Sequence, residues 1–141
     1  MKQKDTWNLT KLFKSDDDSE MEKKRKVILE KSYAFINKWK DRKDYLEDPK
    51  VLKQALDEYE FWLRNYGSSG DEGYYFHLRT AQDQNDPKLK AKENKIEEFS
   101  KKIGNDIQFF TLRIARIPQQ LQNKFLNYED LAPYKHFLET S

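Results

Sequence analysis

Two Asp-Pro segments, each followed by apolar residues at helical spacing, constrain the fold of this chain more than any other feature. Asp48-Pro49 and Asp86-Pro87 each place a favoured helix N-cap residue before a proline, which is accepted at the first helical position. After both segments, apolar residues recur every three or four positions, as they do along one face of an α-helix. The pattern predicts helices over 49–66, where Gly67 can supply a left-handed C-terminal cap, and over 87–115.

An earlier segment carries a third helical pattern. Ser19 and Glu22 form a capping-box pattern, which marks the start of a helix. The apolar stripe behind it consists of Met21, Ile28, Phe35 and Trp39. We therefore expect a long helix over 19–43 with one buried face.

The remaining segments predict shorter helices. A turn over 68–72 is expected to precede a short aromatic helix over 73–82. Pro118 can open another short helical segment. A last helix is expected over 128–139, with a break at Pro133, because proline disrupts a helix interior.

The fold class follows from these patterns. No window alternates apolar and polar residues with a period of two, and no hairpin turn is found. We expect an all-α chain that forms an antiparallel helical bundle with two long helices and several short ones. Residues 1–18 are interpreted as a lead-in segment and residues 19–141 as a single helical domain. Gly104 lies inside the helix over 87–115 and is expected to allow close contact with another helix.

Composition excludes several function classes. The 141 residues include no cysteine, so disulfides, thiolate zinc ligands and a cysteine nucleophile are excluded. The two histidines, His77 and His136, form no HExxH pattern, so no metal-binding or catalytic residue is predicted. A net charge of +2 gives no strong field toward nucleic acid or membrane. No apolar run can span a bilayer and no signal peptide is evident, so we expect a cytoplasmic protein.

Charged clusters are interpreted as solvent-facing. The basic run "KKRK" over 23–26 is flanked by acidic residues that cancel most of its field, so nucleic-acid binding is the weaker alternative and none is expected. Several carboxylates have basic neighbours and are interpreted as solvated faces; they are Glu58, Glu60, Asp71, Glu72, Glu97 and Glu98.

The segment over 65–80 combines three of the four glycines with a run of aromatic residues. A phosphate-binding loop would follow a strand and carry GxxxxGK[ST], and neither condition holds. The segment is therefore interpreted as a helix end, a turn and a helix start. Tyr74, Tyr75 and Phe76 are consecutive, so they cannot all face one core. The surplus aromatic surface is either buried by other helices or forms a partner surface or cleft wall.

Three segments resemble oligoendopeptidase F and its relatives, the zinc metallopeptidases of the thimet oligopeptidase family. The segment over 7–13, "WNLTKLF", resembles the family opening "WDLT.LF", with Asn8 in place of aspartate. The segment over 107–118 is similar to the helix end "..FFELEL.KLP", with Thr111 in place of glutamate. The segment over 126–139 resembles "L..YRHYLE". The three occur in the family's order and span nearly the whole chain.

The resemblance implies the N-terminal, non-catalytic helical domain of such a peptidase, which forms one wall of a channel for oligopeptides. The family's zinc ligands and general-base glutamate lie downstream in HExxH and a later glutamate. No cofactor is thus expected in this chain, and zinc is expected in the catalytic domain of the same polypeptide. Alone, the chain is expected to cleave nothing. The residues assigned to the channel or interdomain surface are Tyr66, Tyr74, Tyr75, Phe76, His77 and Arg79.

A second interpretation remains open at this point. The same aromatic surface could belong to a free-standing helical module that holds a partner helix or peptide.

Overall fold

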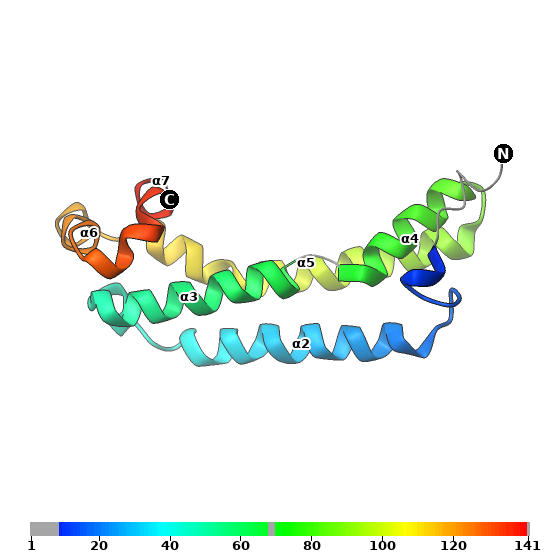
Figure 1. Ribbon diagram of the computed structural model, residues 1–141, viewed down its shortest axis with the longest axis horizontal. Coiled ribbons are helices and arrows are strands. Elements are labelled where there is room, and N and C mark those ends of the chain that lie inside the picture. Colours follow the sequence, from blue (N-terminus) through cyan, green and yellow to red (C-terminus); the bar gives the residue numbers. More distant parts are fainter. Residues whose placement is uncertain (1–8, 68–69, 141) are drawn as a thin grey trace. The chain divides into compact units, whose positions relative to one another are not determined.

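A computed structural model describes residues 9–67 and 70–140 of the chain (Figure 1). Over these residues the fold is all-α, as expected, with no strand. None of their helices is long and apolar enough to cross a membrane. The elements in chain order are η1 (Leu9–Lys11), α2 (Ser19–Trp39), η2 (Asp44–Leu46), α3 (Pro49–Tyr66), α4 (Gly70–Gln82), α5 (Pro87–Ala115), α6 (Gln119–Leu126), η3 (Glu129–Tyr134) and α7 (Lys135–Thr140).

Most helix bounds agree with the sequence patterns. The bounds of α3 and α5 are those that the Asp-Pro segments predict, and the break at Pro133 lies in η3, just before α7. The helix expected over 19–43 ends earlier, at Trp39. The turn expected over 68–72 is shorter, because α4 already begins at Gly70. Its first turn holds two acidic residues, which are favourable next to the positive end of a helix dipole.

Aspartates cap the three longest helices. The carboxylates of Asp18, Asp48 and Asp86 accept hydrogen bonds from backbone amides two residues along, at 3.0, 2.9 and 2.9 Å. These bonds satisfy amide groups that have no partner within the helix. The capping box predicted at Ser19 and Glu22 is therefore wrong, since Asp18 occupies the capping position of α2.

The chain divides into two compact units, where the sequence indicated one domain over 19–141. Unit 1 comprises Met1–Lys31 and Tyr66–Gly104, and unit 2 comprises Ser32–Asn65 and Asn105–Ser141. Helices α2 and α5 each contribute residues to both units, since the boundaries follow Lys31 and Gly104.

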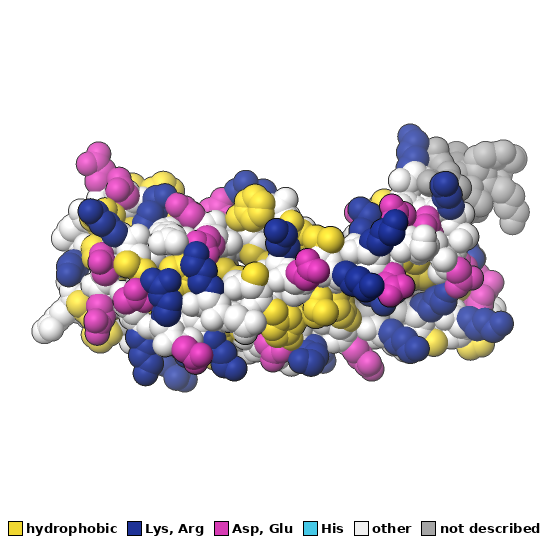
Figure 2. All heavy atoms as spheres, turned by 90° about the horizontal axis from the view of Figure 1, so that it is seen from below, with side chains coloured by type: hydrophobic (Ala, Val, Ile, Leu, Met, Phe, Trp, Pro, Cys, Tyr) yellow, Lys and Arg dark blue, Asp and Glu magenta, His cyan; other side chains and the backbone are white. Residues whose placement is uncertain are grey.

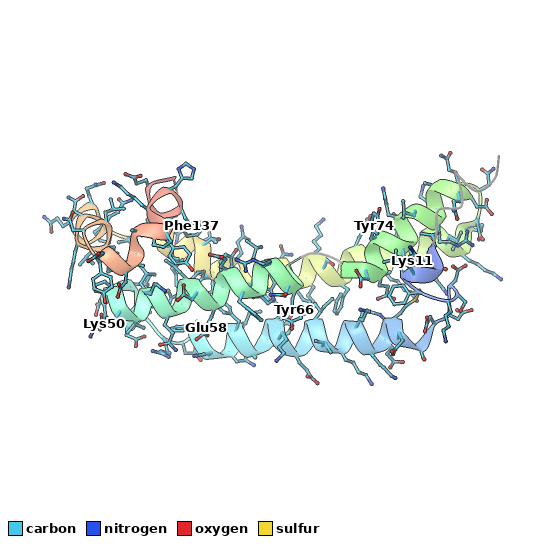
Figure 3. The ribbon with its side chains drawn as sticks, in the orientation of Figure 1. Lys11, Lys50, Glu58, Tyr66, Tyr74 and Phe137 are labelled. Carbon is cyan, nitrogen blue, oxygen red and sulfur yellow. The ribbon has the colours of Figure 1, made fainter. Side chains whose placement is uncertain are left out.

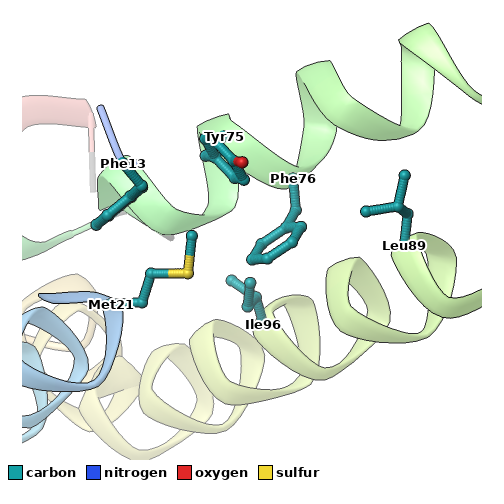
Figure 4. Packing of buried hydrophobic residues seen from close by; sticks show 6 residues of the cluster. All are labelled: Phe13, Met21, Tyr75, Phe76, Leu89 and Ile96. Atoms are coloured by element: carbon teal, nitrogen blue, oxygen red, sulfur yellow. The ribbon is translucent and has the colours of Figure 1, made fainter. Parts of the chain in front are cut away.

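The core of unit 1 includes a residue from the supposed lead-in segment. Phe13 is 2 % exposed, and its ring meets the ring of Tyr75 edge-on at 5.5 Å. Figure 4 shows Phe13, Met21, Tyr75, Phe76, Leu89 and Ile96 converging on one another from the N-terminal segment, α2, α4 and α5. From Leu9 onward, residues 9–18 are thus part of the fold rather than a separate lead-in.

The core of unit 2 is built from aromatic rings around Phe110. The rings of Phe35, Tyr45 and Tyr59 lie 5.2, 5.5 and 4.9 Å from this fully buried side chain. Within this unit α2 and α3 run in opposite directions, because Ser32 bonds Trp62 while Trp39 bonds Glu58.

The structure describes the surroundings of two glycines, Gly70 and Gly104, and the requirement for glycine lies at Gly70 rather than at Gly104. A Cβ atom added at Gly104 would meet nothing within 4 Å, so the expected close helix contact at this residue is wrong. A positive φ of 71° occurs at Gly70 instead. An added Cβ there would lie 3.2 Å from the Cδ1 atom of Ile28. Glycine is therefore required at Gly70, and nothing in the surroundings of Gly104 requires it.

Replacing Gly104 with alanine is expected to raise the free energy of unfolding by about 0.5–1 kcal/mol, because alanine has the higher helix propensity. Urea denaturation followed by circular dichroism measures the change. Gly70→Ala is the matched control and should lower the same free energy by about 1 kcal/mol or more, since its φ is left-handed. A destabilised Gly104→Ala variant would contradict the open surroundings of this position.

Candidate functional site

The residues assigned to a channel surface lie on different faces of α4. Tyr75 and Phe76 are only 4 % and 1 % exposed and belong to the core of unit 1, so their assignment to a surface is wrong. Tyr74, in contrast, is 54 % exposed and projects from α4 (Figure 3). Successive helical residues point about 100° apart, so a run of three aromatic residues must divide between core and solvent.

Tyr66 and Arg79 have separate environments. Tyr66 is half-buried at the end of α3. It lines neither of the two pockets of unit 1 that are described below. Arg79 forms a bidentate pair with Asp16, with Nε 3.0 Å from Oδ1 and Nη2 3.1 Å from Oδ2. The Tyr75 hydroxyl also donates to Oδ1 of Asp16 at 2.7 Å. This cluster binds the N-terminal segment to α4.

The electrostatics of the cluster follow from these bonds. The hydrogen bond from Arg79, joined by that from Tyr75, holds the pKa of Asp16 below its usual range, against an opposing effect of burial. Burial, together with the bond to Asp16, raises the pKa of Tyr75 to about 12. Asp16 is therefore ionised and Tyr75 neutral at neutral pH. No local sequence pattern indicates this pairing, because Asp16 and Arg79 are 63 residues apart.

Unit 1 contains a large pocket of about 540 Å³. It is lined by the segment before α2 and the first turns of α2 (Asp16, Asp17, Asp18, Ser19, Met21, Glu22 and Arg25), by Glu72 and Phe76 of α4, and by Lys92, Lys95, Ile96 and Phe99 of α5. Among the lining residues, Glu72 is 6 % exposed and accepts a hydrogen bond from Nε of Arg25 at 2.7 Å. The sequence suggested that Glu72 lies on a solvated face, and its burial shows that this interpretation is wrong. Burial raises the pKa of Glu72, and the charge of Arg25 offsets part of that effect.

A second feature of unit 1, the α4–α5 hollow, has a volume of about 350 Å³. It is lined by Gly70, Gly73, Tyr74 and His77 from α4 and by Glu93, Ile96 and Glu97 from α5. His77 Nδ1 lies 3.2 Å from a carboxylate oxygen of Glu93. The hollow brings together the exposed members of the expected surface, Tyr74 and His77.

The sequence did not single out Glu93, and it placed Glu97 on a solvated face. Their spacing of four residues puts both carboxylates on one side of α5. Ile96 lies between them in the sequence and is buried in the structure. Its apolar side chain could have indicated that this side of α5 faces another helix. The sequence does not predict that α4 is the helix beside these carboxylates.

The basic run over 23–26 is paired with acidic residues throughout. Lys23 and Lys26 pair with glutamates of their own helix at 3.2 and 3.6 Å, while Lys24 and Arg25 pair with residues of α4 at 3.1 and 2.7 Å. Figure 2 likewise shows basic and acidic side chains interspersed over the face in view. These pairs agree with the cancellation of charge inferred from the sequence.

No set of three or more metal-ligating side chains occurs together within residues 9–67 and 70–140. No protein-family model, curated protein or solved structure matches the chain. The family expected from the sequence is therefore supported only by the three segments over 7–13, 107–118 and 126–139.

Replacing Asp16 with asparagine is expected to lower the free energy of unfolding at pH 7 by about 1–2 kcal/mol, because Arg79 loses its charged acceptor. The pKa of Asp16 is lower in the folded chain than in the unfolded chain. Its contribution is therefore present above the unfolded pKa of about 3.9 and is lost as the pH falls through the folded value.

Urea denaturation of both proteins between neutral pH and about pH 3 tests this expectation, and the difference should shrink as the medium becomes acidic. Asp17→Asn is the control, since the Asp17 side chain is 89 % exposed and should contribute little. A difference that stays constant over this range would contradict the ionic nature of the Asp16–Arg79 pair.

Proposed function

We propose that this chain is the non-catalytic N-terminal domain of an oligoendopeptidase F-like zinc metalloendopeptidase, in which it forms one wall of the oligopeptide channel. The observation that carries the proposal is the order and spacing of the three segments over 7–13, 107–118 and 126–139. Residues 7–8 lie outside the described residues.

The described parts of these segments contribute buried residues to the fold, which supports the proposal. Phe13, from the first segment, is in the core of unit 1. Phe110 and Ile114, from the second, and Leu131 and Leu138, from the third, are at most 4 % exposed. The residues that resemble the family are thus ones that hold the helices together, as expected for a shared fold.

The proposed role is to shape access to the reaction rather than to perform it. In the parent enzyme a zinc-bound water would attack the peptide carbonyl, with a glutamate as base. The sequence of this chain has no HExxH, so those groups would come from the catalytic domain. The exposed face of α4, with Tyr74 and His77, is the part of the expected surface that is open to a peptide.

A second candidate function is a free-standing module that binds a partner helix or peptide. Exposed large hydrophobic side chains favour it; among the described residues the most exposed are Phe61, at 59 %, and Tyr74, at 54 %. It differs from the first proposal in needing no catalytic domain.

The reading frame of the source gene tests the proposal directly. We expect it to continue past the codon for Ser141 into a segment with HExxH, because this chain has only two histidines and lacks that motif. A stop codon directly after Ser141 would contradict the proposal and favour the free-standing module.

In the full polypeptide, Tyr74→Ala is expected to change the ratio of kcat/KM between short and long quenched peptides, because the wall acts on substrate access. Leu63→Ala on α3 is the control, since Leu63 is similarly exposed but does not line the α4–α5 hollow. Equal effects of the two substitutions would count against a specific role for the α4 face.

A further inference from the structure

The α4–α5 hollow holds two carboxylates, and none of its other lining residues carries a permanent positive charge. The Glu97 side chain has no hydrogen bond or ion pair in the described part of the chain. The Glu93 side chain is only 16 % exposed, and its partner His77 carries a charge only when protonated. Two acidic side chains therefore face a hollow with no permanent positive charge among its lining residues.

The large pocket differs in this respect. Its carboxylates already have partners: Asp16 binds Arg79, Asp17 binds Lys92 at 2.8 Å, and Glu72 binds Arg25. Glu22 pairs with Lys26, and Asp18 caps α2. A ligand would have to displace these internal pairs. The α4–α5 hollow offers negative charge without that cost.

The other walls of the hollow fit a basic group with an aliphatic stem. The exposed ring of Tyr74 can bind a cation over its face. Gly73 lines the hollow without a side chain, so the backbone of α4 forms part of its wall. Ile96, which is buried, supplies an apolar surface for methylene groups.

We propose that the α4–α5 hollow binds a basic group of an oligopeptide, a primary ammonium or a guanidinium, between Tyr74 and the carboxylates of Glu93 and Glu97. The identification of the ligand as an oligopeptide rests on the proposed function, and it names basic peptides as the favoured substrate class. The binding of a basic group follows from the hollow itself.

Titration of the full chain with short capped peptides tests the proposal. The central residue is lysine, arginine or norleucine, and a fourth peptide carries norleucine with a free amino terminus. Binding is read from the amide shifts of Gly73 and Ile96 in nuclear magnetic resonance spectra. The lysine or arginine peptide should bind at least about fivefold more tightly than the capped norleucine peptide. The fourth peptide shows whether a terminal ammonium binds in place of a basic side chain.

Glu97→Gln should weaken binding of the basic peptide about three- to fivefold, because one carboxylate loses its charge. Glu98→Gln is the matched control: it removes the same charge from the next residue, which does not line the hollow. Tyr74→Leu should weaken binding to a similar extent, since it removes the aromatic face. Unfolding in urea checks that each variant is folded.

Equal binding of the lysine and capped norleucine peptides, no binding of any peptide, or equal effects of Glu97→Gln and Glu98→Gln would each overturn the proposal. These measurements use the chain alone, so they are independent of the reading frame beyond Ser141. A stop codon there would remove the peptidase proposal while leaving selective binding of a basic group to stand.

Discussion

The bidentate pair between Arg79 and Asp16 organises unit 1. It binds the segment before α2 to α4, and Lys92 of α5 reaches the same place by bonding the backbone oxygen of Asp16 at 2.9 Å. With this segment fixed, Phe13 enters the core and Asp18 is positioned to cap α2. Charge-assisted bonds of this kind are strong and directional, so one pair can define how three elements meet.

The orientation of α4 determines which of its residues can have a function. Its inward face carries Tyr75, Phe76 and Arg79, whose partners lie within unit 1. Its outward side presents Tyr74 and His77 to the α4–α5 hollow. The two sets alternate within one short sequence, because helical rotation separates neighbours by about 100°. A ligand can therefore contact only the second set without disrupting the core.

Local signals predicted most of the helices, whereas the candidate site needed contacts between distant residues. Asp48 and Asp86 cap helices that begin where the sequence indicated, since a cap acts on amides only a few residues away. Helix α2 begins at Ser19 as expected, but its cap was assigned to Ser19 rather than Asp18, because both residue types are acceptable caps. The burial of Glu72 depends on Arg25, 47 residues distant, and no local pattern reports such a pair.

The residues that carry the family resemblance are distinct from those that line the α4–α5 hollow. Phe13, Phe110 and Leu138 lie in the resembling segments and are buried, so packing constrains them. Tyr74 and Glu97 lie outside those segments and contribute little to the core. Substitutions in the hollow can thus change the preferred ligand at little cost to the fold. A helical domain of this kind can retain its packing residues while its ligand preference changes, and the resemblance alone therefore says nothing about specificity.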